Sequence, residues 1–259
     1  MSMYKHPYHL VDVSPWPILL SFSLLSLGFT VVKWLTHMGP TVYIQIALIL
    51  LIAFQWWRDV IREAKAGYHT KKVQNGILIG FLLFLISEIM LFSSFFWAFF
   101  HSSLAPSIEL GVQWPPEGIN PVNTWAIPLL GSSVLVASGF ILTIAHNAFL
   151  AGQKYLCLWM TFFTVLFGAL FLFLQYNEYL YGEVTIADSV YGSVFYMTTG
   201  LHALHVIVGV LFLFISYLRI LYDHFTIEHH LCFEFAIYYW HLVDVVWLFV
   251  FVVYYWWGS

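Results

Sequence analysis

The sequence predicts an all-α membrane protein with seven transmembrane helices. Of its 259 residues, 61% are hydrophobic and only 8% are charged, and the mean hydropathy is +0.84. A soluble domain cannot bury so large an apolar fraction, whereas a membrane protein can expose it to lipid. Seven stretches reach the ~20 apolar residues that cross about 30 Å of hydrocarbon, and none has the alternating pattern of a barrel strand.

The predicted helices follow in order along a single integral membrane domain, residues 1–259. The second carries Trp56 and Trp57 near its end, just before Arg58, where indole rings favour the membrane interface. The third, of about 31 residues, measures roughly 46 Å and must tilt or project from the bilayer. The fourth to sixth are long apolar runs, and the seventh ends in the interfacial sequence YYWW. The predicted ranges are about 16–36, 41–60, 73–103, 125–148, 155–181, 190–218 and 232–257.

The basic residues indicate the orientation. Seven spans place the two ends of the chain on opposite sides, and eight of the nine Lys and Arg residues, Lys5 among them, lie on the N-terminal side. Lys33 alone lies on the other side, whose loops at about 104–124 and 178–189 carry acids such as Glu178. The positive-inside rule therefore puts the N-terminal side in the cytoplasm or the mitochondrial matrix. The first residues lack both a signal-peptide core and Arg-rich transit character, so we expect no cleavable leader.

Glu88 is the one carboxylate in the apolar run at 84–102, near the middle of the third predicted helix. A charged acid there costs about 2.5–3.5 kcal/mol, so we expect it to be protonated or to have a polar partner. Gly76 and Gly80, on roughly the same stripe, would let a neighbouring helix approach. Two interpretations stay open, a proton relay or a neutral acid that fixes helix packing. The lack of a second acid in this span favours packing.

Four further polar residues lie within predicted helices. His202 and His205 share one face of the sixth, and His241 and Asp244 share one face of the seventh. Imidazole could bind haem or copper, with His241 as the further ligand. Alternatively, the histidines hydrogen-bond across helices to Glu88 or Asp244, and Asp244 satisfies His241 locally. The spacing alone favours this packing interpretation.

The segment QWWRDVIREAKAGYHTKK, residues 55–72, combines aromatic anchors with basic side chains. Such a cluster attracts anionic lipid at about 1 kcal/mol per Lys or Arg, although a topology signal alone would explain it. Arg62 with Glu63, and Arg219 at the end of the sixth helix, are candidate lipid head-group sites. HFTIEHH, residues 224–230, resembles a metal motif but is a weak signal, because water reaches the loop. No motif indicates phosphate binding, nucleophilic catalysis or nucleic-acid binding.

Several stretches, taken in order, carry a family resemblance. They are SPWP at 14–17, QWWRDVIRE at 55–63, SE at 87–88, FFWAFFHSSLAP at 95–106, WPPEGI at 114–119, YGSVFYMTTGLHALHVIVG at 191–209 and YWHLVDVVWLF at 239–249, ending in YWWGS. They cover nearly the whole chain, and their combination is specific although each piece alone is not. The chain resembles the subunit III family of the haem–copper cytochrome c oxidases in its mitochondrial form.

The resemblance implies a non-redox core subunit of an oxidase that passes electrons from cytochrome c to O2 and pumps protons. The haems and coppers would then belong to partner subunits I and II, so this chain would hold no cofactor and no metal. Its helices would form a pair and a group of five, with phospholipid filling the cleft between them. The chain would pack on subunit I beside small accessory subunits, support proton uptake, and lie in the mitochondrial inner membrane with its N-terminus in the matrix and its C-terminus in the intermembrane space.

The resemblance also implies roles for particular residues. Glu88 matches an intramembrane carboxylate of the family that reacts with carbodiimide. Positions that contact lipid head groups match Arg62, Glu63, His69 and Arg219. Relatives often carry two adjacent histidines where this chain has Tyr68 and His69, so His69 is the weakest of these matches.

Two rival functions have their own tests. A proton or ion transporter using Glu88, Asp244 and the membrane histidines would conduct in liposomes, but the sequence shows no internal repeat of the transporter kind. A membrane cytochrome with bis-histidine haem would show a Soret band in the isolated chain.

Overall fold

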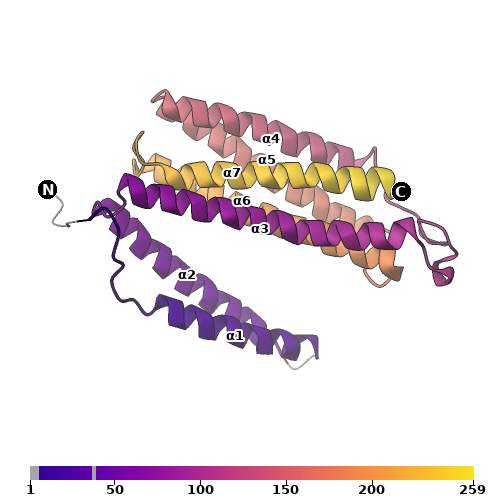
Figure 1. The fold of residues 1–259 in the computed structure, drawn as a ribbon. Helices are drawn as coiled ribbons and strands as arrows, with labels where there is room; N and C mark the ends of the chain where they lie inside the picture. The colour runs from indigo at the N-terminus through magenta and orange to yellow at the C-terminus, as the bar shows by residue number, and fades with distance from the viewer. Residues whose placement is uncertain (1–5, 37–38) are drawn as a thin grey trace. The chain divides into compact units, whose positions relative to one another are not determined.

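A computed structural model describes residues 6–36 and 39–259, so Lys5 lies outside the described residues. Seven helices in this part of the chain are long and apolar enough to cross a membrane. The only β feature among the described residues is an isolated bridge between Thr226 and His229. The predicted all-α fold with seven candidate spans is therefore confirmed (Figure 1).

The chain divides into two compact units, and the division falls between Ile79 and Gly80. The first unit contains the antiparallel helices α1 (Trp16–Leu35) and α2 (Thr41–Lys65) and the start of α3 (Lys71–Leu104). Helix α2 continues to Lys65, beyond the predicted end at about residue 60. Its last turns, DVIREAK, are rich in helix-forming residues but too polar for a hydropathy profile to include them.

The second unit contains the rest of α3 and four further long helices. These are α4 (Ile127–Leu150), α5 (Lys154–Tyr181), α6 (Ser189–Leu221) and α7 (Leu231–Val250), which continues directly as a π-helix, η2 (Phe251–Trp257). A short 3-10 helix, η1 (Ile108–Leu110), lies in the loop after α3. Helix α7 packs against both α4 and α6, and α5 lies against α4 and α6 (Figure 1). The grouping of the long helices into a pair and a larger bundle agrees with the family resemblance.

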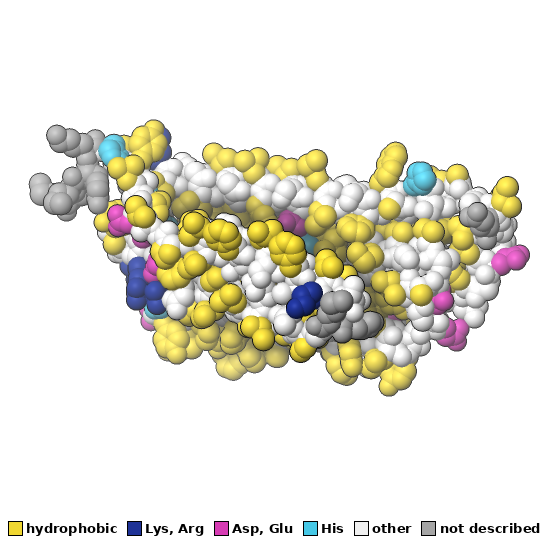
Figure 2. All heavy atoms as spheres, turned by 90° about the horizontal axis from the view of Figure 1, so that it is seen from below, with side chains coloured by type: hydrophobic (Ala, Val, Ile, Leu, Met, Phe, Trp, Pro, Cys, Tyr) yellow, Lys and Arg dark blue, Asp and Glu magenta, His cyan; other side chains and the backbone are white. Residues whose placement is uncertain are grey.

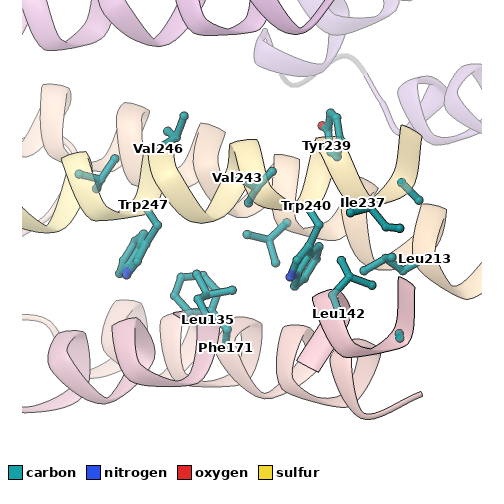
Figure 3. Packing of buried hydrophobic residues seen from close by; sticks show 14 of the residues in the cluster. Leu135, Leu142, Phe171, Leu213, Ile237, Tyr239, Trp240, Val243, Val246 and Trp247 are labelled. Carbon is teal, nitrogen blue, oxygen red and sulfur yellow. The ribbon is translucent and has the colours of Figure 1, made fainter. Parts of the chain in front are cut away.

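The core of the second unit is built around two tryptophans of α7. Trp240 and Trp247 project from α7 toward α4 and α5 (Figure 3), where Leu135 and Phe171 are also fully buried. The indole N–H groups donate to Ser138 Oγ at 2.8 Å and Ser132 Oγ at 2.9 Å. Both bonds matter, because a buried donor without an acceptor costs about 1–3 kcal/mol.

Glycines make room for Trp240. A Cβ added at Gly168 of α5 would lie 2.5 Å from the indole, and one added at Gly209 of α6 would lie 2.9 Å from it. The expected close approach at Gly76 and Gly80 is not found, since a Cβ added at either glycine meets nothing within 4 Å. The glycines that make room for the Trp240 indole therefore lie on α5 and α6.

Burial differs sharply between helices. In the most apolar window of α1, 6% of the residues are buried, compared with 50% in that of the span formed by α7 and η2. Large hydrophobic side chains such as Phe22 and Phe29 are exposed on α1, and hydrophobic side chains recur along the molecular surface in Figure 2. Water would disfavour such a surface, whereas lipid chains or apolar partner helices would cover it.

Candidate functional site

Glu88 forms a direct contact with a histidine of another helix. Its Oε2 lies 2.6 Å from Nε2 of His205, so α3 and α6 are joined at this point. His205 Nδ1 lies 2.8 Å from the backbone carbonyl oxygen of Leu201. The edge of Phe92 and the stacked ring of Tyr239 flank the imidazole. The polar partner predicted for Glu88 is therefore His205.

The geometry fixes how the pair carries its protons. A carbonyl oxygen can only accept, so Nδ1 of His205 must hold a hydrogen. Nε2 then either accepts a hydrogen bond from a neutral Glu88 or, as part of an imidazolium, donates one to the carboxylate. Both arrangements contain the same number of protons and have no net charge. The exposed fractions of the side chains, 18% for Glu88 and 10% for His205, show that the rest of the bundle shields this neutral pair.

His202 lies one turn away and is fully buried. Its Nε2 lies 3.1 Å from the carbonyl oxygen of Val243, and its ring packs against Phe171 and Trp247. Nδ1 of His202 has no hydrogen-bond partner among the described residues. The His202 side chain thus joins α6 to the backbone of α7, and aromatic rings pack against two sides of the imidazole.

Asp244 and His241 share the face of α7 that meets Gly139 of α4, as the spacing predicted. However, no hydrogen bond joins them among the described residues, and Oδ1 of Asp244 is buried without a partner. Oδ2 of Asp244 faces Gly139 of α4, where an added Cβ would lie 2.5 Å from it. Asp244 therefore packs against the α4 backbone instead of satisfying His241.

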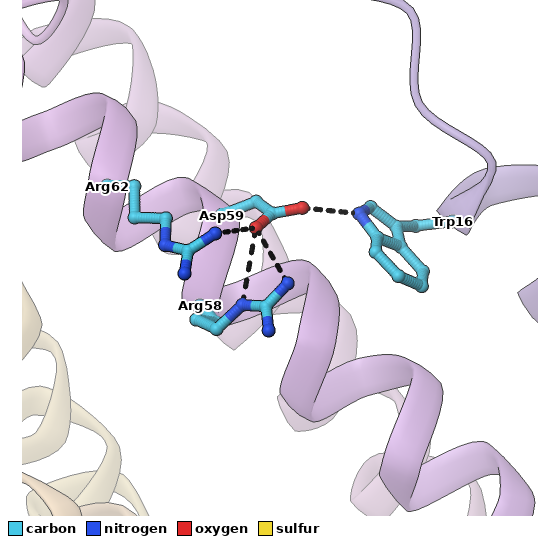
Figure 4. A network of polar contacts seen from close by, with 4 residues as sticks. All are labelled: Trp16, Arg58, Asp59 and Arg62. Carbon is cyan, nitrogen blue, oxygen red and sulfur yellow. Dashed lines mark hydrogen bonds and ion pairs between the residues drawn. The ribbon is translucent and has the colours of Figure 1, made fainter.

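In the first unit, an aspartate that the sequence did not single out organises the basic end of α2. Asp59 Oδ2 accepts a 2.8 Å hydrogen bond from Nε1 of Trp16, the first residue of α1. Its Oδ1 lies 3.4 Å from Arg58 and 3.6 Å from Arg62 (Figure 4). This network ties α1 to α2 and leaves 68% of the Arg62 side chain exposed.

The other head-group candidates have separate surroundings. Glu63 faces His9 at 3.8 Å and not Arg62, because adjacent helix positions point in different directions. The His69 ring lies 6.0 Å from that of His9, and its backbone oxygen accepts a bond from Gln74. Arg219, in the second unit, stacks over Phe225 at 4.3 Å, and its buried Nε has no hydrogen-bond partner among the described residues.

A further buried acid was placed ambiguously by the sequence analysis. Glu178 was counted with the loop at 178–189, although the helix predicted at 155–181 also includes it, and it lies inside α5 with 6% of its surface exposed. Its Oε1 accepts hydrogen bonds from Tyr255 Oη at 2.6 Å and from Gln175 Nε2 at 3.2 Å. Gln175 at i−3 was the available signal, since it gives α5 a polar stripe at helical spacing. The backbone oxygen of Tyr255 also accepts a bond from Thr124.

Comparison with known proteins identifies the family to which this arrangement belongs. The family model described as cytochrome c oxidase subunit III matches residues 6–259. The cytochrome c oxidase subunit 3 of Pisaster ochraceus is 49% identical, over 99% of this chain and 99% of the relative. Those of Raphicerus campestris and Paracentrotus lividus are each 48% identical over the full length of both chains. The chain therefore belongs to the cytochrome c oxidase subunit III family.

Proposed function

We propose that this chain is a core subunit without a redox centre, which stabilises subunit I, binds structural phospholipid and supports proton uptake. As a member of its family, it is a component of an oxidoreductase complex. The observation that carries the proposal is the Glu88–His205 contact at 2.6 Å, because it uses the intramembrane acid to hold two helices together. Electron transfer from cytochrome c to O2 would then be the work of subunits I and II.

The positions of the histidines support the absence of haem and copper from this chain. A haem ligand needs a ring nitrogen that is free to face the iron. Nε2 of His202 is directed at a backbone carbonyl, and Nε2 of His205 is directed at Glu88. Nδ1 of His202 is unpaired among the described residues, but the ring is fully buried against Phe171 and Trp247. Both rings are also packed among aromatic side chains, which favours a role in packing.

A packing role for Glu88 is favoured over a relay for a related reason. A proton wire needs a series of groups that exchange protons in turn. The two ring nitrogens of His205 are engaged by Glu88 and by a carbonyl oxygen that cannot take a proton onward. The pair can therefore exchange a proton internally without passing it along α6.

Two arginines support the binding of phospholipid head groups. Arg62 is largely exposed and contacts its ion-pair partner Asp59 only at 3.6 Å, so its guanidinium has donors left for a phosphate. Arg219 has a buried Nε without a partner among the described residues, and Phe225 holds the plane of its guanidinium. Glu63 and His69 would complete the surroundings of Arg62 in the first unit.

The distribution of charge supports the orientation, with the N-terminus in the matrix if the membrane is the mitochondrial inner membrane that the family resemblance implies. Lys154, at the start of α5, bonds to Asp223 at 2.6 Å just after the end of α6. Lys154 and Arg219 therefore lie at the same end of the second unit, as the positive-inside rule requires. Small accessory subunits and apolar helices of subunit I would cover exposed hydrophobic surface.

Removing this chain from the purified oxidase tests the proposal. The depleted complex should keep its haem and copper and its initial rate of cytochrome c oxidation. It should lose activity faster during turnover and take up protons more slowly. Loss of stoichiometric haem or copper together with the chain would contradict the proposal.

Native mass spectrometry tests the lipid sites separately. Arg62→Gln and Arg219→Gln should each reduce the amount of phospholipid retained by the complex. Lys33→Gln is the matched control, since it removes a basic residue from the opposite side. Equal retention in all three variants would exclude the two head-group sites.

A further inference from the structure

Three potential metal ligands, one from α4 and two from the start of α7, lie close together at the end of the second unit that carries Lys154 and Arg219. His146 lies one turn before the end of α4, His230 directly precedes α7, and Glu234 lies in the first turn of α7. One ligand atom from each residue lies within 4.8 Å of the other two. This group is distinct from the Glu88–His205 pair and contains one residue of the HFTIEHH motif.

His230 is oriented as a metal ligand would be. Its Nδ1 lies 3.2 Å from the backbone oxygen of Thr226, which can only accept, so Nδ1 carries a hydrogen. In the neutral ring, the lone pair is then on Nε2. This atom is buried, makes no hydrogen bond among the described residues and lies 3.3 Å from Oε1 of Glu234. A carbonyl that fixes the tautomer and direction of an imidazole is a usual feature of protein metal sites.

His146 supplies the second unsatisfied nitrogen. Its Nε2 is buried and has no hydrogen-bond partner among the described residues. Its ring lies 6.2 Å from that of His230 and meets the edge of Phe233 at 6.1 Å. Phe149 packs against both His230 and Phe233, so an apolar wall limits the access of water.

We infer that His146, His230 and Glu234 bind a divalent transition metal, Zn²⁺ in the first place. Two imidazoles and one carboxylate with an open fourth position are an established set of ligands for zinc. At bond lengths of about 2.1 Å, tetrahedral ligands lie roughly 3.4 Å apart. The His230–Glu234 separation of 3.3 Å already has this value. Bringing His146 closer completes three ligands, and water can occupy the fourth position because 26% of the Glu234 side chain is exposed.

A hydrogen-bonded cluster alone explains the arrangement less well. Glu234 could accept a hydrogen bond from one protonated histidine, but the buried Nε2 of the other histidine would still lack a partner. A cation binds both lone pairs and the carboxylate together. The ion would join the end of α4 to the beginning of α7, the two helices that the Trp240–Ser138 hydrogen bond also connects.

Zinc binding to the whole oxidase tests this inference. The complex is treated with a chelator, equilibrated with micromolar ZnCl2, freed of excess metal, and measured for zinc per haem. Zinc held elsewhere in the complex is the same in every preparation. His146→Gln and His230→Gln should each lose one zinc equivalent relative to the parent complex. Glu234→Gln should weaken that site at least about tenfold, the lower end of what loss of an outer-shell partner costs.

Two controls belong to the same loop. His224→Gln and Glu228→Gln change exposed residues of the same chemical types and should retain the equivalent. Zinc-edge anomalous scattering from the parent complex should give a peak within bonding distance of all three proposed ligands. This measurement does not depend on the assembly of any variant. Absence of the peak, a peak on His224, or equal zinc in all variants would overturn the inference.

Discussion

Replacing Gly168 by alanine tests how tightly the bundle is packed around Trp240. The new Cβ would lie 2.5 Å from Cη2 of Trp240 and 2.6 Å from Cγ2 of Val210. Carbon atoms in contact normally lie about 3.5–4.0 Å apart, so each neighbour would have to move by about 1 Å. Trp240 cannot move easily, because it is fully buried, held by Ser138 and confined by Gly209.

The expected cost follows from this overlap. Overpacking costs about 1–3 kcal/mol, and the two rigid neighbours place Gly168→Ala at about 2–3 kcal/mol in this range. A chain of this size loses about 2–4 °C of melting temperature per kcal/mol, which gives a decrease of roughly 4–12 °C. Gly200→Ala is the matched control. It also lies within a helix, but its nearest neighbour, Tyr179 Oη, would be at 3.9 Å, an ordinary contact.

The assay is the temperature at which this chain dissociates from the purified oxidase in detergent, followed by native electrophoresis and tryptophan fluorescence. Gly168→Ala should lower this temperature, and Gly200→Ala should leave it nearly unchanged. Trp240→Phe removes the clashing part of the indole, so the double variant with Gly168→Ala should be less destabilised than the sum of the single changes. Equal dissociation temperatures for the two alanine variants, or strict additivity in the double variant, would refute the reasoning.

Three other substitutions test the polar contacts. Glu88→Gln should leave assembly intact and proton pumping at most modestly changed, because an amide still hydrogen-bonds the facing histidine; loss of O2 reduction in an assembled complex would contradict this. Tyr255→Phe should destabilise the chain by about 1–3 kcal/mol, since the buried Glu178 loses its shortest hydrogen bond, and thermal dissociation measures this. Trp16→Phe should lower the dissociation temperature by less, because two arginines still pair with Asp59; a larger decrease than for Tyr255→Phe would reverse this ranking.

Hydropathy was sufficient to predict the number and type of the helices but not where all of them end. The length of an apolar run indicates how many residues lie in the hydrocarbon layer, whereas the helix itself can continue into the polar interface. Helix α2 therefore runs to Lys65, and α6 runs to Leu221 rather than about residue 218. The same limit left Glu178 in both the helix predicted at 155–181 and the loop predicted at 178–189, because hydropathy does not locate the boundary between them.

Pairing between distant residues was only partly predictable. Contact between His205 and Glu88 was among the alternatives because the two are polar and lie deep in their helices. The group formed by His146, His230 and Glu234 could not be recognised from spacing, because α4 and α7 must first pack together. The spacing of His241 and Asp244 correctly placed both on one face, toward α4, but it did not show that no hydrogen bond joins them among the described residues.

The wide turn that ends α7 makes the number of residues there as important as their type. In an α-helix, consecutive side chains differ by about 100° in direction, yet in η2 both Tyr254 and Tyr255 are 1% exposed. Tyr254 bonds to Thr198, and Tyr255 bonds to Glu178 on a different helix. Deleting the exposed Val252 would barely alter hydrophobicity, but it would rotate the following residues and withdraw at least one phenol from its partner. A deletion of one residue in this segment would thus break a buried tyrosine hydrogen bond although the hydropathy profile would hardly change.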